Sequence, residues 1–215
     1  MLFENFFLNS FVIFLAAYLI GSFPTAYIAG KIKKINISEA GNKNVGGTNA
    51  VFVLGKPLGI AVLIIDIVKG LLVVWLASIF SFYHPFIPML AVVFTTIGHN
   101  WMFPIKFKGG KGTGVLVGSL IYLAPFSIPV LFLILIPLAS FLVKDSFLGV
   151  GIGMFFFSFI MWAWKGNYYW LIFMVFLTII YSLRCLNLYI TYFTEKRRYL
   201  NPFVRMMLKP FLKKK

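Results

Sequence analysis

Long apolar runs separated by short polar segments are the main pattern in this 215-residue chain. A helical run of about 20 apolar residues crosses the roughly 30 Å hydrocarbon core of a bilayer. Runs near this length recur at residues 6–30, 58–80, 86–103, 112–124, 126–143, 147–164 and 168–188. The pattern predicts an all-α, polytopic membrane bundle of about seven transmembrane helices, of which the fourth is short.

The composition excludes a water-soluble domain. The chain is 61% hydrophobic and 12% charged, whereas soluble domains average about 45–50% apolar and about 25% charged. These values argue against a disordered chain, a secreted disulfide scaffold and a free nucleic-acid-binding protein. The single cysteine, Cys185, excludes an intrachain disulfide.

Basic residues predict the orientation of the helices. The positive-inside rule places loops rich in lysine and arginine on the cytoplasmic side. With the N-terminus outside, 18 of the 20 basic residues fall on the inner side, Lys69 lies within a run and only Lys165 falls outside. The chain is therefore predicted to be N-out and C-in. The first residues lack a basic stretch, so a cleaved signal peptide is not expected.

The connections between the apolar runs are too short for a second folded domain. We therefore expect one transmembrane domain at residues 1–192 and a basic tail at residues 193–215. The tail mixes aromatic and basic residues, which is typical of a segment attracted to anionic lipid at the membrane surface. Two Gly-x-x-x-Gly spacings, at residues 114–118 and 149–153, predict close helix packing.

The unusual polar sequence lies in the inner loops. Residues 41–49 read Gly-Asn-Lys-Asn-Val-Gly-Gly-Thr-Asn. Glycines let successive N–H groups turn toward one anion, and the asparagine, threonine and lysine side chains add donors. A phosphate-handling loop and a flexible cytosolic turn are both consistent with this composition.

A second inner loop, residues 107–114, reads Phe-Lys-Gly-Gly-Lys-Gly-Thr-Gly and opens directly into an apolar run. Paired glycines between Lys108 and Lys111 suit an anion at a helix N-terminus. His99 stands at the membrane edge before this loop, where an imidazole is able to accept a proton near neutral pH. A basic turn and a packing histidine are the structural alternatives.

Charged residues near or within the apolar runs point to further contacts. Asp66 and Lys69 share a helical face, so we expect an internal ion pair that supports a nearby pocket from behind. Arg184 and Asn187 share a face by the same spacing at the inner end of the last run. They suit a phosphate clamp, although an arginine there also snorkels to the interface.

These patterns predict an anion-handling site on the inner face of a membrane bundle, with phosphorylated lipids or lipid precursors as substrates. The sequence has no His, Cys and carboxylate set with metal-ligand spacing, so no metal is expected. Its five acidic residues offer no credible Ser-His-Asp triad.

Five motifs in order resemble the bacterial membrane acyl-phosphate:glycerol-3-phosphate acyltransferases. They are Gly-Ser-Phe-Pro at 21–24, Gly-x-x-Asn-Val-Gly-Gly-Thr-Asn at 41–49, Leu-Gly-Lys at 54–56, Asp-Ile-Val-Lys-Gly at 66–70, and Gly-His through Phe-Pro to Phe-Lys-Gly-Gly-Lys-Gly at 98–112. Asn187 fits the C-terminal motif of that family. The resemblance implies a seven-spanning, N-out protein of the bacterial cytoplasmic membrane, with its site facing the cytosol.

The resemblance also implies a reaction that needs no cofactor. The 1-hydroxyl of glycerol 3-phosphate attacks the carbonyl of a fatty acyl phosphate, giving 1-acyl-glycerol 3-phosphate and phosphate in phospholipid synthesis, without metal, coenzyme A or acyl-enzyme. His99 and Lys111 would be catalytic, with His99 as proton acceptor unless the bound phosphate serves. The residues that would hold the substrates are Asn44, Gly46, Gly47, Thr48, Asn49, Lys108, Gly109, Gly110, Gly112 and Asn187.

The chain departs from the family pattern at three acceptor positions. Asn42 stands where the family has serine, Phe52 where it has arginine, and Arg184 where it has histidine. A phenylalanine cannot hold a phosphate, so Lys43 and Arg184 are candidate compensating charges.

Other functions stay open from the sequence. A diverged relative that keeps acyl phosphate but uses another acceptor fits the altered acceptor positions. A non-catalytic membrane protein that binds anionic lipid through its tail fits the basic charge. A transporter would need a polar path through the bundle, for which Asp66 and Lys69 alone are thin support.

Overall fold

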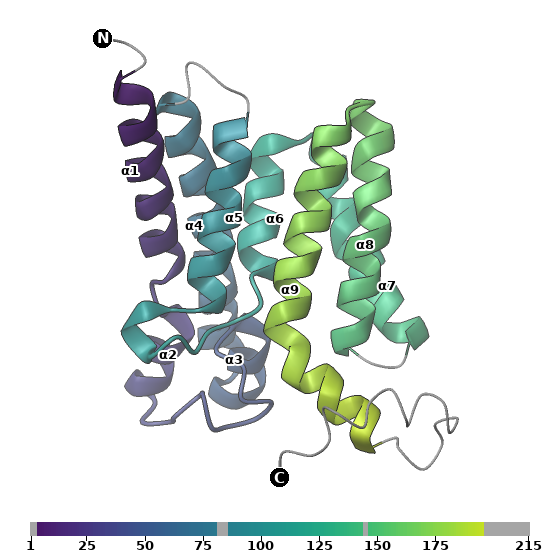
Figure 1. Cartoon of the computed structure of the whole chain (residues 1–215). Helices are drawn as coiled ribbons and strands as arrows, with labels where there is room; N and C mark the ends of the chain where they lie inside the picture. The colour runs from purple at the N-terminus through teal and green to yellow at the C-terminus, as the bar shows by residue number, and fades with distance from the viewer. Residues whose placement is uncertain (1–3, 81–85, 144–145, 196–215) are drawn as a thin grey trace. The chain divides into compact units, whose positions relative to one another are not determined.

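The described part of the chain is helical (Figure 1). The computed structural model describes residues 4–80, 86–143 and 146–195, and extended pairing within them is limited to an isolated bridge between Met102 and Lys108. The elements are α1 (Glu4–Gly21), α2 (Thr25–Ile32), α3 (Gly47–Leu54), α4 (Lys56–Phe80), α5 (Phe86–Asn100), a 3-10 turn η1 (Phe103–Ile105), α6 (Thr113–Leu123), α7 (Ser127–Val143), α8 (Ser146–Lys165) and α9 (Tyr168–Glu195). The predicted all-α class is confirmed.

Each predicted apolar run is helical, although the first, at residues 6–30, is broken into α1 and α2. Four helical segments are long and apolar enough to cross a membrane: Phe6–Ile32, Lys56–Ile79, Leu148–Lys165 and Tyr168–Leu186. α5, α6 and α7 are apolar but shorter. The chain is thus a polytopic membrane bundle, while the count of seven spans and the N-out orientation stay predictions.

Contacts divide the chain into two compact units, residues 1–134 and 135–215. In the first unit α4 packs on α6, α3 and α5, and α1 packs on α5. In the second unit α8 packs on α9. α9 continues to Glu195, into the predicted basic tail, and residues 196–215 lie outside the described residues. The division into a domain at 1–192 and a tail stays a prediction.

Glycines let helices of the first unit approach backbone to backbone. A side chain on Gly118 would collide with the carbonyl of Ile67, and one on Gly70 with the carbonyl of Val115. The Ser119 hydroxyl donates to the Gly70 carbonyl at 3.4 Å across the same seam. The close packing predicted from the Gly-x-x-x-Gly spacing in α6 is therefore confirmed, and it holds α4 against the start of α6.

The break between α1 and α2 supplies a buried acceptor. Pro24, which has no N–H, stands immediately before α2. A side chain on Gly21 would collide with the Thr95 carbonyl of α5, so the end of α1 lies directly on α5. The Phe23 carbonyl accepts a hydrogen bond from Lys69 Nζ at 2.7 Å. The helix break therefore ties α4 to the start of α2.

One predicted loop is partly helical. We expected a single loop over residues 41–49, but α3 begins at Gly47. Ala50 and Leu54 on this helix are buried in an apolar cluster with Val45 and Val62. Burial of that face favours the helix over an open loop, so the prediction was wrong for the last three residues of the segment.

In the second unit, small residues again set the packing. Side chains on Gly149 and Gly153 of α8 would contact Ser140 and Ile136 of α7, which confirms the second predicted close approach. The chain turns from α8 into α9 at Gly166, whose φ of +61° favours glycine.

Candidate active site

The two predicted inner loops meet in the first unit. The Val45 N–H donates to the Gly109 carbonyl at 3.3 Å. A Cβ on Gly46 would lie 3.7 Å from the Cα of Gly110. Two glycine-rich segments that are far apart in the sequence therefore share one short stretch of backbone.

Two helices begin beside this junction. α3 begins one residue after Gly46, and α6 begins after Gly112, whose φ of +77° lies in the left-handed region. The first N–H groups of a helix lack intrahelical acceptors and carry the positive end of the helix dipole. The residues that precede the two helices, Gly46 and Gly112, have no side chain that would occupy these N–H groups. The junction therefore presents backbone donors that suit an anion.

Lys108 and Lys111 flank the paired glycines of the second loop. Lys108 is exposed and Lys111 is half-buried. The Met102 N–H donates to the Lys108 carbonyl at 3.2 Å, which closes a short hairpin before the glycines. The loop thus places two cationic side chains next to the start of α6.

Asn49 organises the first loop. Its Nδ2 lies within hydrogen-bond reach of the carbonyls of Asn44 at 2.9 Å, Ala40 at 3.1 Å and Ile37 at 3.3 Å. Its Oδ1 accepts a hydrogen bond from the Asn42 N–H at 3.1 Å. The side chain is 1% exposed. Both ends of this buried amide therefore bond the loop backbone.

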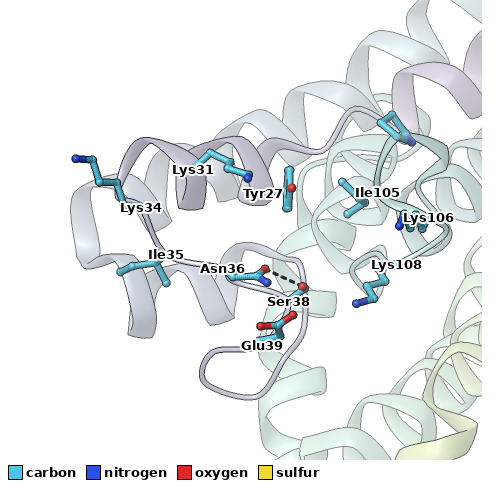
Figure 2. A pocket seen from close by; sticks show the side chains of 11 residues that line it. Tyr27, Lys31, Lys34, Ile35, Asn36, Ser38, Glu39, Ile105, Lys106 and Lys108 are labelled. Carbon is cyan, nitrogen blue, oxygen red and sulfur yellow. Dashed lines mark hydrogen bonds between the residues drawn. The ribbon is translucent and has the colours of Figure 1, made fainter.

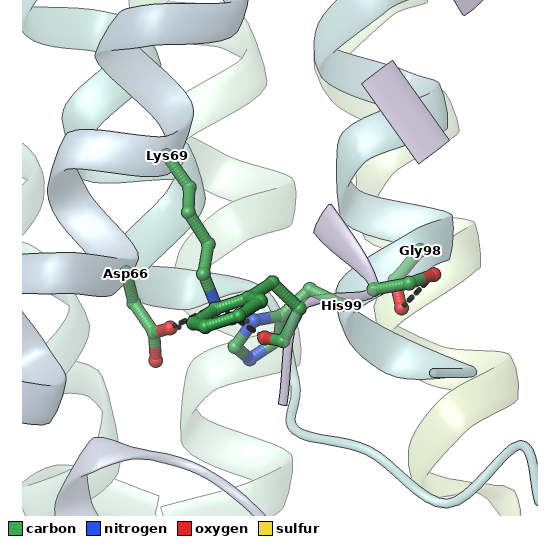
Figure 3. Close-up of polar contacts among 6 residues, drawn as sticks. Asp66, Lys69, Gly98 and His99 are labelled. Atoms are coloured by element: carbon green, nitrogen blue, oxygen red, sulfur yellow. Dashed lines mark hydrogen bonds and ion pairs between the residues drawn. The ribbon is translucent and has the colours of Figure 1, made fainter. Parts of the chain in front are cut away.

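Asp66, Lys69 and His99 form a buried polar group (Figure 3). Lys69 Nζ donates to Asp66 Oδ1 at 2.8 Å, which confirms the internal ion pair expected from their spacing. Asp66 Oδ1 lies 3.8 Å from His99 Nδ1. Lys69 also holds the Phe23 carbonyl, so these three side chains link α4, α5 and the break before α2.

His99 lies directly under the glycine–lysine loop. A Cβ on Gly110 would collide with His99 Nε2, so only glycine fits over the imidazole. The Gly110 N–H donates to the His99 carbonyl at 3.0 Å. The histidine is 3% exposed. Its ring therefore supports the loop from below.

Asn100 is a residue that the sequence analysis missed. It is 0% exposed, and neither its Oδ1 nor its Nδ2 has a hydrogen-bond partner among the described residues. Its Oδ1 would lie 3.3 Å from a Cβ on Gly112. An unpaired buried amide costs about 1–3 kcal/mol. An asparagine directly after His99, at the end of an apolar run, was the signal available in the sequence.

Comparison with known proteins identifies the family of the chain. A family model described as glycerol-3-phosphate acyltransferase matches residues 11–189. The chain belongs to the glycerol-3-phosphate acyltransferase family. Glycerol-3-phosphate acyltransferase 2 of Dehalococcoides mccartyi strain CBDB1 is 41% identical over 162 residues, which cover 72% of each chain. Glycerol-3-phosphate acyltransferase 2 of Moorella thermoacetica is 37% identical over 126 residues, covering 58% of this chain and 64% of the relative.

The fold is also that of a solved acyltransferase. The crystal structure of PlsY, an integral membrane glycerol 3-phosphate acyltransferase, in its glycerol 3-phosphate form superposes with a TM-score of 0.76 at 20% identity. The match covers 87% of this chain and 93% of that one. The lysophosphatidic acid form gives a TM-score of 0.73 at 19% identity, over the same shares of the two chains.

Within this acyltransferase family member, the first loop carries most of the remaining predicted residues. Asn44 is half-buried, and its N–H bonds the Asn42 side chain at 3.1 Å. Thr48 and Lys43 are exposed. Phe52 is 81% exposed on α3. The first loop is thus held by its own amide groups and leaves these other side chains at the surface.

Two predicted site residues lie in the second unit. Arg184 is half-buried in α9, and Asn187 belongs to the same helix. The side chain of Asn187 lies outside the described side chains. Their proximity to the loop junction therefore stays a prediction. Among the described residues, no three His, Cys, Asp or Glu side chains gather into a group that would bind a metal ion.

Proposed function

We propose that the chain transfers a fatty acyl group from acyl phosphate to the 1-hydroxyl of glycerol 3-phosphate. The hydroxyl oxygen bonds to the acyl carbonyl carbon while the bond from that carbon to the phosphate oxygen breaks. The hydroxyl proton leaves with the released phosphate. The products are 1-acyl-glycerol 3-phosphate and inorganic phosphate. The meeting of two glycine-rich loops at the starts of α3 and α6 carries this proposal.

The donor phosphate binds at the glycine–lysine loop in this proposal. Lys108, Lys111 and the first N–H groups of α6 neutralise its oxygens, and the nearby α3 start adds further donors. Because phosphate is already a good leaving group, the protein needs only to position the reactants and to stabilise developing charge. Gly109, Gly110 and Gly112 let this phosphate-binding loop lie directly on the end of α5, where side chains would collide with His99, Asn100 and Thr96.

The acceptor binds at the mouth of the first loop. Asn44 and Thr48 orient it, and the family motif adds Asn187 as a further candidate for contact with the acceptor. Lys43 and Arg184 supply the positive charge that the family places at the position of Phe52. Gly46 and Gly47 contribute backbone N–H groups, and glycine at 47 also lets α3 lie against Leu63 of α4. Asn49 acts on the acceptor through the loop that its amide holds.

His99 positions the loop in this proposal, and the bound phosphate accepts the proton. The burial of His99 beneath Gly110 favours this role over direct proton transfer. Asp66, itself bonded to Lys69, lies 3.8 Å from His99 Nδ1 and supports the imidazole from behind in this proposal. We further propose seven spans with the N-terminus outside, so that the site faces the cytosol of a bacterial cytoplasmic membrane.

A second function is favoured by one observation. Phe52 is 81% exposed at a position where the family carries arginine. A protein that keeps the donor site but lacks this arginine suits acyl transfer to an acceptor other than glycerol 3-phosphate.

Phosphate release from palmitoyl phosphate tests both functions. The full chain in detergent is assayed with and without glycerol 3-phosphate, beside Lys111→Ala and the matched exposed control Lys56→Ala. Release that requires glycerol 3-phosphate, is lost in Lys111→Ala and persists in Lys56→Ala supports the proposed acyltransferase. Release stimulated only by other polyols, and lost in Lys111→Ala, supports the second function. Release unaffected by Lys111→Ala contradicts both.

A further inference from the structure

A basic cavity of about 570 Å³ lies beside the hairpin that leads into the glycine–lysine loop (Figure 2). α2, the segment at residues 35–39 and the hairpin at residues 104–108 surround it. It shares Lys108 with the glycine–lysine loop and includes no other residue of the two loops at the junction. Cavities of about 300–1,000 Å³ hold small molecules or headgroups.

The cavity is rich in positive charge. Lys31, Lys34, Lys106 and Lys108 line it, and Glu39 is its one carboxylate. None of these lysines forms an ion pair with a carboxylate within the described residues. Because like charges around one hollow repel each other, a bound anion would lower the electrostatic energy of this arrangement.

Neutral donors add to the lysines. The Ser38 hydroxyl donates to Asn36 Oδ1 at 2.9 Å, so the amide of Asn36 keeps its NH₂ group as a donor on the cavity wall. The lysine ammonium groups and the NH₂ half of the Asn36 amide donate hydrogen bonds, and a phosphate dianion offers only acceptors. The chemistry of the wall therefore matches a phosphate better than a neutral or cationic ligand.

Two of the lysines occupy costly backbone positions. Lys34 follows α2 and Lys106 ends η1, each with φ of +57°. This left-handed conformation is one that glycine or asparagine adopts more easily, and it costs other residues roughly 1 kcal/mol or more. The chain places lysine at both positions, and both side chains line the cavity.

We propose that this cavity is a second phosphate site, separate from the donor site at the glycine–lysine loop, that binds a phosphate monoester group. The monoester belongs either to a small soluble phosphate or to the headgroup of an anionic lipid. The proposal does not rest on acyl transfer, because binding at the cavity is measured without turnover.

Lysine footprinting tests the proposal residue by residue. The full chain is methylated reductively in detergent, and modification at each lysine is read by mass spectrometry. The probes are inorganic phosphate and glycerol 3-phosphate, with sodium chloride at matched ionic strength as the screening control. Parallel samples are in nanodiscs of phosphatidylcholine with or without phosphatidate. Lys33 and Lys56 are exposed inner-loop lysines outside the cavity and serve as internal references.

We expect phosphate to slow modification of Lys31, Lys34 and Lys106 by about fivefold relative to the two reference lysines. Protection by both soluble phosphates identifies a soluble ligand. Protection only in phosphatidate nanodiscs identifies a lipid headgroup. Equal protection of the reference lysines, or no protection by any probe, overturns the proposal. Lys111 is read in the same spectra, so failure of the cavity is distinguished from failure of the donor site.

A matched pair of variants completes the test. Lys34→Gln with Lys106→Gln removes two charges from the cavity, and Lys33→Gln with Lys56→Gln removes two charges elsewhere on the inner loops. The first variant should lose protection of Lys31, and the second should keep it. Loss of protection in both variants, with unchanged thermal unfolding, would show that only the overall charge matters and would overturn the proposal.

Discussion

The two units of the chain differ in what they bury. Residues 1–134 bury charged and amide groups, among them Asp66, Lys69, His99 and Asn100. In residues 135–215, no charged or amide side chain among those described is buried, and the buried Ser158 hydroxyl bonds the Met154 carbonyl of its own helix at 3.0 Å. Both units use glycines for close helix packing.

Both units therefore pack their helices closely. Among the described residues, buried charged and amide side chains belong to the first unit alone. Buried charges are costly in a membrane protein and mark functional positions more often than structural ones. The first unit accepts this cost directly beneath the loop junction. The proposed donor site therefore lies among the buried polar groups of the first unit, and the described part of the second unit packs mainly through apolar side chains.

Gly110→Ala should give the largest loss of activity. The added methyl group collides with His99 Nε2 and shifts the glycine–lysine loop. We expect turnover to fall about 100-fold, since displacement of a catalytic loop by about 1 Å has effects of this size. Gly153→Ala in the second unit is the control, because its methyl group meets mainly the flexible end of Ile136. Comparable turnover losses in both variants would contradict the division of roles.

Asp66→Asn should have the largest effect on stability. It leaves the Lys69 ammonium buried without its carboxylate partner. We expect a loss of about 3 kcal/mol in the free energy of unfolding, measured by thermal unfolding in detergent. The double change Asp66→Leu with Lys69→Met should recover much of this stability but not turnover. The control Ser158→Ala in the second unit should change the free energy of unfolding by less than about 0.5 kcal/mol. A larger loss of stability in Ser158→Ala than in Asp66→Asn would contradict the difference between the two units.

Asn100→Leu separates function from stability within the first unit. Leucine has nearly the same shape and removes the unpaired buried amide, so we expect stability to rise by about 1 kcal/mol. Turnover should fall roughly tenfold if the amide supports the loop beside Gly112. Thr96→Val is the control, because the Thr96 hydroxyl already bonds the Val92 carbonyl. Unchanged turnover in Asn100→Leu would assign the amide no part in the site.

Phe52→Arg should have the smallest effect. Phe52 is 81% exposed, so arginine is accommodated without loss of packing. Restoring the charge that the family pattern carries there should lower the KM for glycerol 3-phosphate about threefold, the size of one exposed ion pair. Ile32→Arg on α2 is the control, because Ile32 is 71% exposed and arginine there should leave the KM unchanged. A lower KM in both variants would show a nonspecific charge effect.

The sequence predicted the helices well because apolar length is a local property. The apolar runs are helical, the first of them broken into α1 and α2, and the Asp66–Lys69 pair formed as its three-residue spacing predicted. The start of α3 was missed because Gly47 and Thr48 are ordinary turn residues, and only burial of Ala50 and Leu54 makes the segment helical. Local composition does not report that burial.

The sequence by itself determined the class of the protein, its apolar segments and the place of its two glycine-rich loops, since these follow from residue type and spacing. The tertiary structure decided what those residues do. In it, Val45 bonds Gly109 and Gly110 packs on His99. The Asn49 amide bonds the backbone of its own loop, and Asn100 is buried near Gly112, just before α6. These contacts join segments distant in the chain, and their geometry depends on how α4, α5 and α6 pack.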